Sequence, residues 1–242
     1  MKYAVLFSLL LAACSADALE APVVAGGASS LQSVLTAVSA AWQPSKGSSV
    51  TWSFEASSSL LRRQEAGAAF ELMVLADEEL ARKACRSGVP KVLWANHIVL
   101  AARGAVLPLA ALSDLVQRDG PIALAAAAVP AGAAARRVLL EAGVLDQVQA
   151  RLVDAASVRG ALALLQAGAA QWAFVYDTDV RGAAEVSAAW RSGADGPGRV
   201  LCSVVLTTDA PRASTLSLFE HLSSPSVRAL ATARGFLPVE QH

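Results

Sequence analysis

The chain has 242 residues, which is enough for one large domain or two smaller lobes with a sizeable core. Its 20 Lys and Arg residues balance its 20 Asp and Glu residues, so the formal net charge is zero. Because a nucleic-acid-binding surface needs an excess of basic residues, this balance argues against a nucleic-acid partner. The histidines (His97, His221 and His242) lie far apart without metal-ligand spacing, which gives a metal site little support.

Residues 1–18 are predicted to be a targeting segment outside the fold. Lys2 and the apolar run 3–13 have the pattern of a signal peptide, and this run is too short to span a bilayer. Two processing signals overlap after it. Leu11–Cys14 looks like a bacterial lipobox in which Cys14 is lipidated, whereas Ala16–Ala18 fits ordinary signal peptidase. The lipobox is favoured because its small residues and cysteine directly follow the apolar run. Either signal predicts a periplasmic or other extracytoplasmic protein.

Short apolar strands then alternate with helical patterns. In chain order the expected elements are a strand at 23–25, a turn at 26–28, a helix at 30–42, a strand at 50–54, a helix from the triple serine at 57–59 to Gly67, a strand at 70–76, a helix capped by Asp77 and ending near Gly88, a strand at 97–102, a helix at 109–117, a strand at 121–126, a helix from Pro130 to Gly143, a helix capped by Ser157 and ending at Gln166, strands at 172–176 and 200–207, and helices at 213–222 and 225–233. This alternation is typical of an α/β protein with mostly parallel sheets.

Two cysteines remain beyond Cys14. An exported compartment permits a disulfide between Cys85 and Cys202. Two separate buried thiols are the favoured interpretation, because one cysteine lies in a helical pattern and the other in a distant strand-like run.

The junctions between strands and helices are the informative feature. Four of them carry small, hydroxylated or glycine residues where a helix begins, namely 26–30, 56–59, 129–132 and 157–160. A helix N-terminus offers unpaired N–H donors and a partial positive charge, so it favours anions. In open α/β sheets these junctions lie at the carboxyl ends of strands, where ligands bind. Each junction taken alone is explained as well by ordinary helix capping.

Motifs for common enzyme chemistry are missing. The chain has no G-x-G-x-x-G dinucleotide fingerprint, no G-x-x-x-x-G-K-[ST] phosphate loop and no G-x-S-x-G nucleophile elbow. His97 and His221 lie in no recognisable catalytic context. The sequence therefore predicts a binding protein rather than an enzyme.

A series of motifs follows the same order as the predicted elements. The chain reads G-A-S-S-L at 27–31, F-E-A-S-S-S-L-L-R at 54–62, A-G-A-A-F-E-L-M at 66–73, V-P-A-G at 129–132, V-R-G-A-L-A-L at 158–164, V-Y-D-T-D at 175–179 and R-G-F at 234–236. In this order the motifs resemble the periplasmic molybdate-binding proteins of ABC transporters, which are type II periplasmic substrate-binding proteins. The resemblance covers nearly all of the mature chain.

This resemblance implies a two-lobed α/β fold, in which each lobe is a mostly parallel sheet flanked by helices and the ligand lies in the cleft between them. Lobe 1 is expected at 19–96 and 200–242, and lobe 2, with crossing strands, at 97–199. The implied protein is a monomer without a cofactor that captures a tetrahedral oxyanion, molybdate or tungstate, and delivers it to an ABC transporter permease. Its membrane contact would be a lipid on Cys14.

The resemblance also implies a ligand site made of neutral donors. Ser30 and Ser57 would bind the oxyanion through hydroxyl and N–H groups, Ala131 and Val158 through backbone N–H groups, and Tyr176 through its phenol. Ser29 and Ser58 are adjacent alternatives, because the alignment can slip by one residue within a serine run.

The chain departs from the family pattern at three places. Residues 125–128 are four alanines where a D-P-E-like segment is common, and Glu55 and Asp177 place carboxylates near the expected anion site. Both acids are expected to point outward, because burying an unpaired carboxylate is costly. Two alternatives stay open: a binding protein for another oxyanion such as sulfate or phosphate, or an anchored sensor or interaction protein with the same fold.

Overall fold

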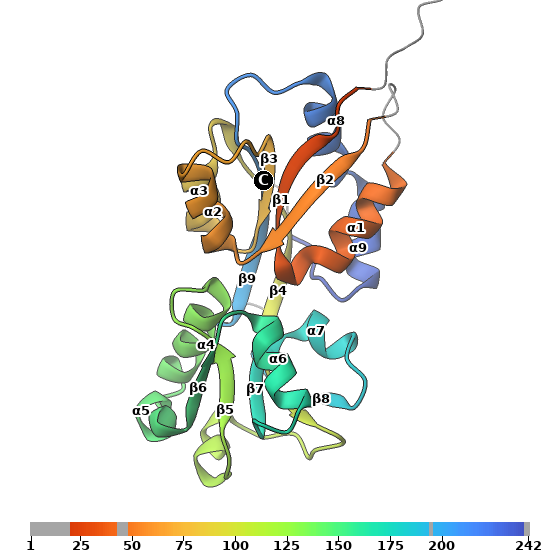
Figure 1. Ribbon diagram of the computed structural model, residues 1–242. Helices are drawn as coiled ribbons and strands as arrows, with labels where there is room; N and C mark the ends of the chain where they lie inside the picture. Colours follow the sequence, from red (N-terminus) through yellow and green to blue (C-terminus); the bar gives the residue numbers. More distant parts are fainter. Residues whose placement is uncertain (1–19, 43–47, 194–195, 240–242) are drawn as a thin grey trace, which may run out of the picture.

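The computed structural model describes residues 20–42, 48–193 and 196–239, which form two lobes stacked one above the other (Figure 1). Two strands, β4 (Ser87–Arg103) and β9 (Arg199–Leu206), join the lobes. The predicted targeting segment, including Cys14, lies outside the described residues. Within the described ranges, no helix has the length and apolar character needed to cross a membrane.

Lobe 1, the upper lobe in Figure 1, is built on a mostly parallel sheet. Strand β1 (Val23–Ala28) lies between β2 (Val50–Glu55) and β3 (Leu72–Leu75) and is parallel to both, and β9 continues the sheet antiparallel to β3. Helices cover both faces of this sheet. They are η1 (Ser29–Leu31), α1 (Gln32–Ala41), α2 (Ser57–Glu65), α3 (Glu78–Ala84), α8 (Ala213–Leu222) and α9 (Pro225–Ala233).

Lobe 2 repeats this plan. Strand β5 (Ile122–Ala125) is parallel to β6 (Leu152–Ala155) and β7 (Trp172–Tyr176), while the end of β4 pairs antiparallel with β7 and β8 (Val186–Arg191). The helices of this lobe are η2 (Leu112–Gln117), α4 (Pro130–Glu141), α5 (Leu145–Val148), η3 (Gln149–Arg151), α6 (Val158–Gln166) and α7 (Asp177–Arg181). The predicted fold class is confirmed.

The lobes meet where β4 passes from one sheet into the other. Residues up to His97 pair with β9, and residues from Ile98 onward pair with β7 and β8. The boundaries predicted from the sequence, 96/97 and 199/200, fall within β4 and at the start of β9.

Most predicted elements are present, but some predictions need correction. The expected turn at 26–28 is a continuation of β1, because a Cβ at Gly27 would come within 2.7 Å of the Phe54 ring and glycine lets β1 and β2 pair tightly. The helix capped by Asp77 ends at Ala84 and not near Gly88, because strand β4 already begins at Ser87, whereas a strand was expected only from His97. The expected helix at 109–117 is a shorter 3-10 helix at 112–117. Strands β6 and β8 and helices α5 and α7 were not predicted.

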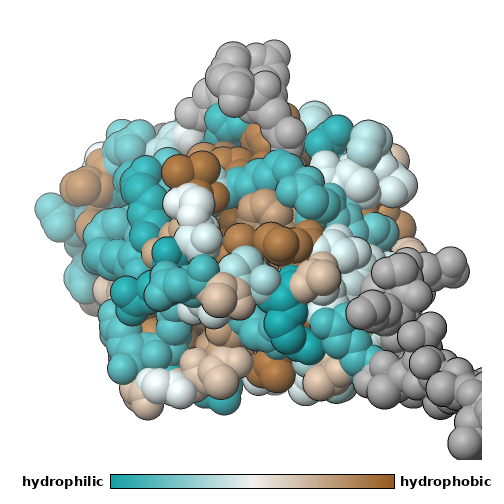
Figure 2. Space-filling view, turned by 90° about the horizontal axis from the view of Figure 1, so that it is seen from above, coloured by the Kyte–Doolittle hydropathy of each residue, from teal (hydrophilic) through white to brown (hydrophobic). Residues whose placement is uncertain are grey.

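The burial of the central strands explains why the other strands could be predicted from their apolar sequence pattern. Every residue of β3, β5 and β7 is buried, as expected for parallel strands that are covered by helices on both faces. Exposed large hydrophobic side chains are scattered, with Val24 and Leu216 on lobe 1 and Leu107 and Leu140 on lobe 2. Seen from above, the end of lobe 1 likewise mixes hydrophilic and hydrophobic side chains (Figure 2). Such scatter is ordinary for a protein surface.

The two described cysteines are free thiols, as the favoured interpretation expected. Cys202 is buried in β9, and burial raises its pKa to about 12. Cys85 directly follows α3 and is only half-buried, so it is more exposed than predicted. Burial still raises the pKa of its thiol.

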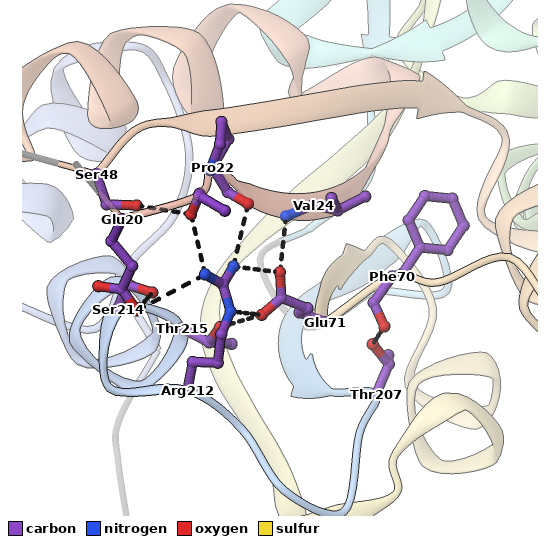
Figure 3. Close-up of polar contacts among 11 residues, drawn as sticks. Glu20, Pro22, Val24, Ser48, Phe70, Glu71, Thr207, Arg212, Ser214 and Thr215 are labelled. Carbon is purple, nitrogen blue, oxygen red and sulfur yellow. Dashed lines mark hydrogen bonds and ion pairs between the residues drawn. The ribbon is translucent and has the colours of Figure 1, made fainter. Parts of the chain in front are cut away.

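One polar cluster fastens the start of lobe 1 to α8 (Figure 3). Arg212 donates two hydrogen bonds to the Glu71 carboxylate, at 2.7 and 2.8 Å, and two more to the carbonyl oxygens of Ala21 and Pro22, both at 3.0 Å. Thr215 also donates to Glu71, at 2.7 Å. The hydrogen bonds from Arg212 are the main reason why the pKa of Glu71 is lowered. This cluster therefore holds the first described residues against β3 and α8.

Replacing this arginine should destabilise the protein in a pH-dependent way. A carboxyl with a lowered pKa stabilises the folded state above its unfolded pKa of 4.5, and this contribution is lost as the pH falls further. We expect Arg212→Met to reduce the free energy of unfolding by about 1–3 kcal/mol at neutral pH, with a narrowing difference from wild type below about pH 4.5. Urea unfolding of both proteins, at neutral pH and below about pH 4.5, measures this difference in the free energy of unfolding.

The matched control is Arg82→Met, which removes an exposed ion pair with Glu78 on α3 and should change stability by less than about 0.5 kcal/mol. Equal effects of the two substitutions at neutral pH would contradict the role given to Arg212.

Candidate functional site

A cavity of about 20 Å³ lies between the lobes. It has room for one small ion or a water molecule, whereas sites for drug-sized ligands measure several hundred Å³. Its lining residues come from the strand–helix junctions of both lobes. They are Ala28, Ser29, Ser30, Ala56, Ser57 and Ala76 from lobe 1, and Val129, Pro130, Ala131, Ser157, Val158 and Tyr176 from lobe 2.

The structure brings the residues expected from the sequence to this one cavity. Ser30, Ser57, Ala131, Val158 and Tyr176 all line it, although they come from five different junctions. Of the two adjacent alternatives, Ser29 lines the cavity and Ser58 is not among the lining residues. Sequence reasoning missed Ala76, which follows β3 and precedes the helix cap Asp77. Its position beside a predicted cap was the available signal.

The triple serine does not cap α2. The N-cap residue is Ala56, and no side chain caps this helix. Ser57 instead accepts a hydrogen bond from the backbone N–H of Ala76 at 3.0 Å, and its side chain is buried. Because the hydroxyl oxygen already accepts this bond, its proton remains to be donated toward the cavity. Ser59 accepts a hydrogen bond from Arg62 at 3.0 Å, within the helix surface.

In lobe 2, two helix starts present backbone donors. Ser157 caps α6 by accepting a hydrogen bond from Gly160 N–H at 3.1 Å, as predicted, and Val158 is the first helical residue after it. Its N–H has no acceptor within the helix. Helix α4 begins with Pro130, which has no N–H, so Ala131 provides the first donor of that helix.

A glycine brings α4 close to the end of β5. A Cβ on Gly132 would lie 2.1 Å from the carbonyl oxygen of Ala125 and 2.2 Å from that of Ala126. No side chain fits at that distance, so the glycine of the V-P-A-G motif lets the first turn of α4 rest directly on the strand end. This contact sets the position of the neighbouring Ala131 N–H.

Tyr176 provides the phenol of the site. It is the last residue of β7, it is only 2% exposed, and it lines the cavity. Burial, helped by the nearby Cys202 and two aspartates, raises the pKa of Tyr176 well above its usual value. The hydroxyl therefore keeps its proton at physiological pH and can donate a hydrogen bond.

Acidic groups surround the cavity without lining it. Glu55 forms an ion pair with Arg63, and Asp177 forms ion pairs with Arg181 at 3.1 Å and Arg191 at 2.9 Å. Neither acid is among the lining residues, which agrees with the expectation that both point outward.

A third acid, Asp179, was passed over by the sequence reasoning. Its carboxylate accepts a hydrogen bond from Tyr176 N–H at 3.2 Å. Burial raises the pKa of Asp179 to about 6, while this hydrogen bond and the charge of Arg159 oppose the rise. The Asp179 carboxylate is therefore held by the backbone of Tyr176, and Asp179 is not among the residues that line the cavity.

The electrostatics of the cavity thus come from dipoles. None of the described residues that line it has a charged side chain. Helix N-termini and hydroxyl groups supply the positive potential, and such a lining suits a small anion. In the part of the chain that the structure describes, no group of three or more His, Cys, Asp or Glu residues is placed to hold a metal cation.

Comparison with known proteins gives the family. Residues 23–237 match the family described as bacterial extracellular solute-binding protein. The chain belongs to this family. It is thus one of the solute-binding proteins and not a member of an enzyme family, and the family description agrees with the predicted export.

Individual relatives carry the resemblance further. The chain is 27% identical to the molybdate-binding protein ModA of Escherichia coli K12 over 229 residues, which cover 90% of this chain and 89% of that protein. A solved substrate-binding domain of a putative molybdenum ABC transporter from Clostridium difficile is 25% identical with a TM-score of 0.68, covering 91% of this chain and all of that one. The periplasmic molybdate-binding protein of Azotobacter vinelandii has the same fold, with 21% identity, a TM-score of 0.79 and coverage of 90% and 100%. The resemblance noted from the sequence motifs is confirmed.

The hydrogen bond between Ser57 and Ala76 should be visible in the stability of the ion-free protein. Ser57→Ala leaves the buried Ala76 N–H without its acceptor, so we expect a loss of about 1–3 kcal/mol in the free energy of unfolding. The control is Ser58→Ala on the same turn, for which less than about 0.5 kcal/mol is expected. Chemical denaturation measures both, and equal stability of the two variants would refute this account of Ser57.

Proposed function

We propose that the protein is an extracytoplasmic binding protein for a tetrahedral oxyanion, molybdate or tungstate, which it delivers to an ABC transporter permease. One observation carries the proposal: donors from five strand–helix junctions of both lobes line a single cavity without a charged side chain among its described lining residues. The names of the relatives, a molybdate-binding protein and a molybdenum transporter domain, support the choice of ion.

We assign the ion contacts to the predicted residues. Ser30 and Ser57 would donate from their hydroxyls, Ala131 and Val158 from their backbone N–H groups, and Tyr176 from its phenol. Hydrogen bonds to a charged group contribute about 1.5–3 kcal/mol each, so five of them are compatible with a micromolar to nanomolar Kd. Ser29, which also lines the cavity, is an additional donor within reach of the same ion.

A lining with a surplus of hydrogen-bond donors selects for protonation state. A fully deprotonated dianion can accept a hydrogen bond from every donor of the site. A protonated phosphate would bring an O–H group that the backbone N–H groups cannot accept, so a hydroxyl of the site would have to accept from it instead of donating to the ion, which reduces binding. Sulfate is also a dianion, so cavity size must distinguish it from the larger molybdate and tungstate.

The proposed cycle uses the two-lobed fold. The ion would enter while the lobes are apart, and the lobes would close over it by a hinge motion at β4 and β9. The closed protein would then dock on its permease as a monomer, held near the membrane by a lipid on Cys14 if the lipobox is used.

Ion selectivity tests this function directly. We expect molybdate and tungstate, added at about 100 times their Kd, to stabilise the protein by about 2.7 kcal/mol, which corresponds to a rise in melting temperature of roughly 5–10 °C. Sulfate and phosphate at the same concentration should have little effect. Thermal unfolding of the mature protein measures this. A shift with none of the ions would sink the proposal, and a shift with sulfate or phosphate alone would move it to those ions.

Single-donor variants test the assigned contacts. Tyr176→Phe and Ser30→Ala each remove one hydroxyl and keep the fold of the cavity wall. We expect each to raise the Kd for molybdate by about 5- to 150-fold, equivalent to about 1–3 kcal/mol. Calorimetric titration measures the change, with Ser58→Ala as the control because Ser58 is not among the lining residues. If Tyr176→Phe and Ser30→Ala both bind like wild type, the site assignment is wrong even though the fold stands.

A further inference from the structure

Besides the bond from Asn96 of β4 to Thr178 of α7, at 2.8 Å, a side-chain hydrogen bond between α6 and α1 joins the lobes beside the cavity. Nη1 of Arg159, on α6 in lobe 2, donates to Oε1 of Gln32, on α1 in lobe 1, at 2.8 Å. Neither residue is among those that line the ion cavity. Both belong to its immediate support, however, because Arg159 directly follows Val158 and Gln32 begins α1 directly after the η1 turn that contains Ser30. The bond therefore links two of the helix starts that supply donors to the ion.

The bond lies next to a second, larger cavity, which Arg159 lines. A crevice of about 740 Å³ is lined from lobe 1 by residues such as Ser30, Ser33 and Phe236 and from lobe 2 by residues such as Arg159 and Asp179. It shares Ser30 with the ion cavity, so it borders the ion cavity on one side. Arg159 lines this crevice, and its partner Gln32 lies between the lining residues Ser30 and Ser33 in the sequence, so their bond joins the lobes next to the crevice.

A second contact shows that the walls fit closely here. Arg181 of α7 lies against Gly235, which follows α9 in lobe 1, so tightly that a Cβ on Gly235 would be 2.5 Å from its Cδ atom. Gly235 also has a φ of +93°, which favours glycine at this position. The lobes are thus in contact on the side where Arg159 and Gln32 meet.

The partners of Arg159 suit a contact that must form and break. Arg159 is exposed and Gln32 is half-buried, so their bond exchanges with hydrogen bonds to water when the lobes separate. The carboxylate of Asp179, in the same lobe, attracts the guanidinium of Arg159. The bond is also neutral on the lobe 1 side, so it brings no carboxylate to the start of α1.

We propose that Arg159 and Gln32 form a latch that holds the closed lobes over the bound ion and sets its dissociation rate. The proposal rests on the proposed function, since it gives the latch a role in retaining the oxyanion. Both residues are positioning residues, because they act on the lobes and make no contact with the ion cavity. Loss of the latch shifts the population toward the open form, from which the ion escapes. It leaves the donors of the open protein unchanged, so the association rate should stay nearly constant.

The kinetic test uses full-length mature protein loaded with radiolabelled molybdate and chased with unlabelled molybdate. We expect Gln32→Ala to raise the dissociation rate about fivefold, equivalent to about 1 kcal/mol, with the association rate changed less than about twofold. Ser33→Ala is the matched control, because Ser33 lines the crevice on the same helix as Gln32. An unchanged dissociation rate, or a loss confined to association, overturns the latch.

A double-mutant cycle separates the bond from the charge of Arg159. If the two side chains act together, Gln32→Ala should have little further effect in an Arg159→Met background. Additive effects on the dissociation rate would show that the two residues act independently, and would therefore contradict the latch.

Hydrogen exchange of the ion-free protein distinguishes failure of the latch from failure of the proposed function. Arg159→Met in lobe 2 should speed exchange at the first turn of α1 in lobe 1, an effect across the cleft that a local role in α6 would not produce. If wild type binds none of the oxyanions but this cross-lobe effect is present, the ion assignment fails and the latch between the lobes stands. If wild type binds molybdate and neither exchange nor dissociation changes, the latch fails alone.

Discussion

The architecture depends on how β4 changes sheets. Its residues pair with β9 up to His97, which lies opposite Arg199, and the next residue, Ile98, lies opposite Tyr176 at the end of β7. A single step along this strand therefore takes the chain from the sheet of lobe 1 to the sheet of lobe 2. It also places Tyr176 at the boundary between the lobes, with the carboxyl ends of the parallel strands of both lobes facing it. The cavity forms there because the helix starts of the two lobes meet at this boundary. Most of the residues that line it are alanine or serine, whose small side chains leave space between the lobes.

Capping and binding are connected at these helix starts. No side chain caps η1, α2 or α4, so their first N–H groups need another acceptor. Buried N–H groups without acceptors are costly, and an oxyanion in the cavity would satisfy several of them at once. The Ser57 hydroxyl also has two roles: its oxygen accepts a hydrogen bond from Ala76 N–H, and its proton can be donated to an ion in the cavity. The ion-free protein should accordingly be less stable than the ion-bound protein, because an ion in the cavity would accept hydrogen bonds from these N–H groups.

Local patterns explain which parts could be predicted from the sequence. Strand β7 and helices α8 and α9 were predicted with their observed bounds, because an apolar run buried on both faces and amphipathic helices, one with proline at its first position, give strong local signals. Strand β6 was missed because two of its four residues, Val153 and Asp154, are exposed. The residues proposed to contact the ion were taken from motifs, and the structure shows that they line one cavity. The Arg159–Gln32 bond was not predictable, since it joins residues 127 positions apart and depends on how the lobes meet.

The arrangement of charge around the cavity suits the proposed binding of a dianion without a cation. Glu55 and Asp177 are neutralised by arginines outside the cavity, and Asp179 is turned toward the Tyr176 backbone with Arg159 nearby. Arg159 in turn reaches across to an amide oxygen. A glutamate in place of Gln32 would pair with Arg159 more strongly, but it would place a carboxylate at a helix start that must attract an anion. A neutral acceptor therefore gives a weaker contact between the lobes and keeps the potential at the cavity positive. That weakness also suits a protein that must open again to release its ion, since a latch worth several kcal/mol would hold the lobes closed.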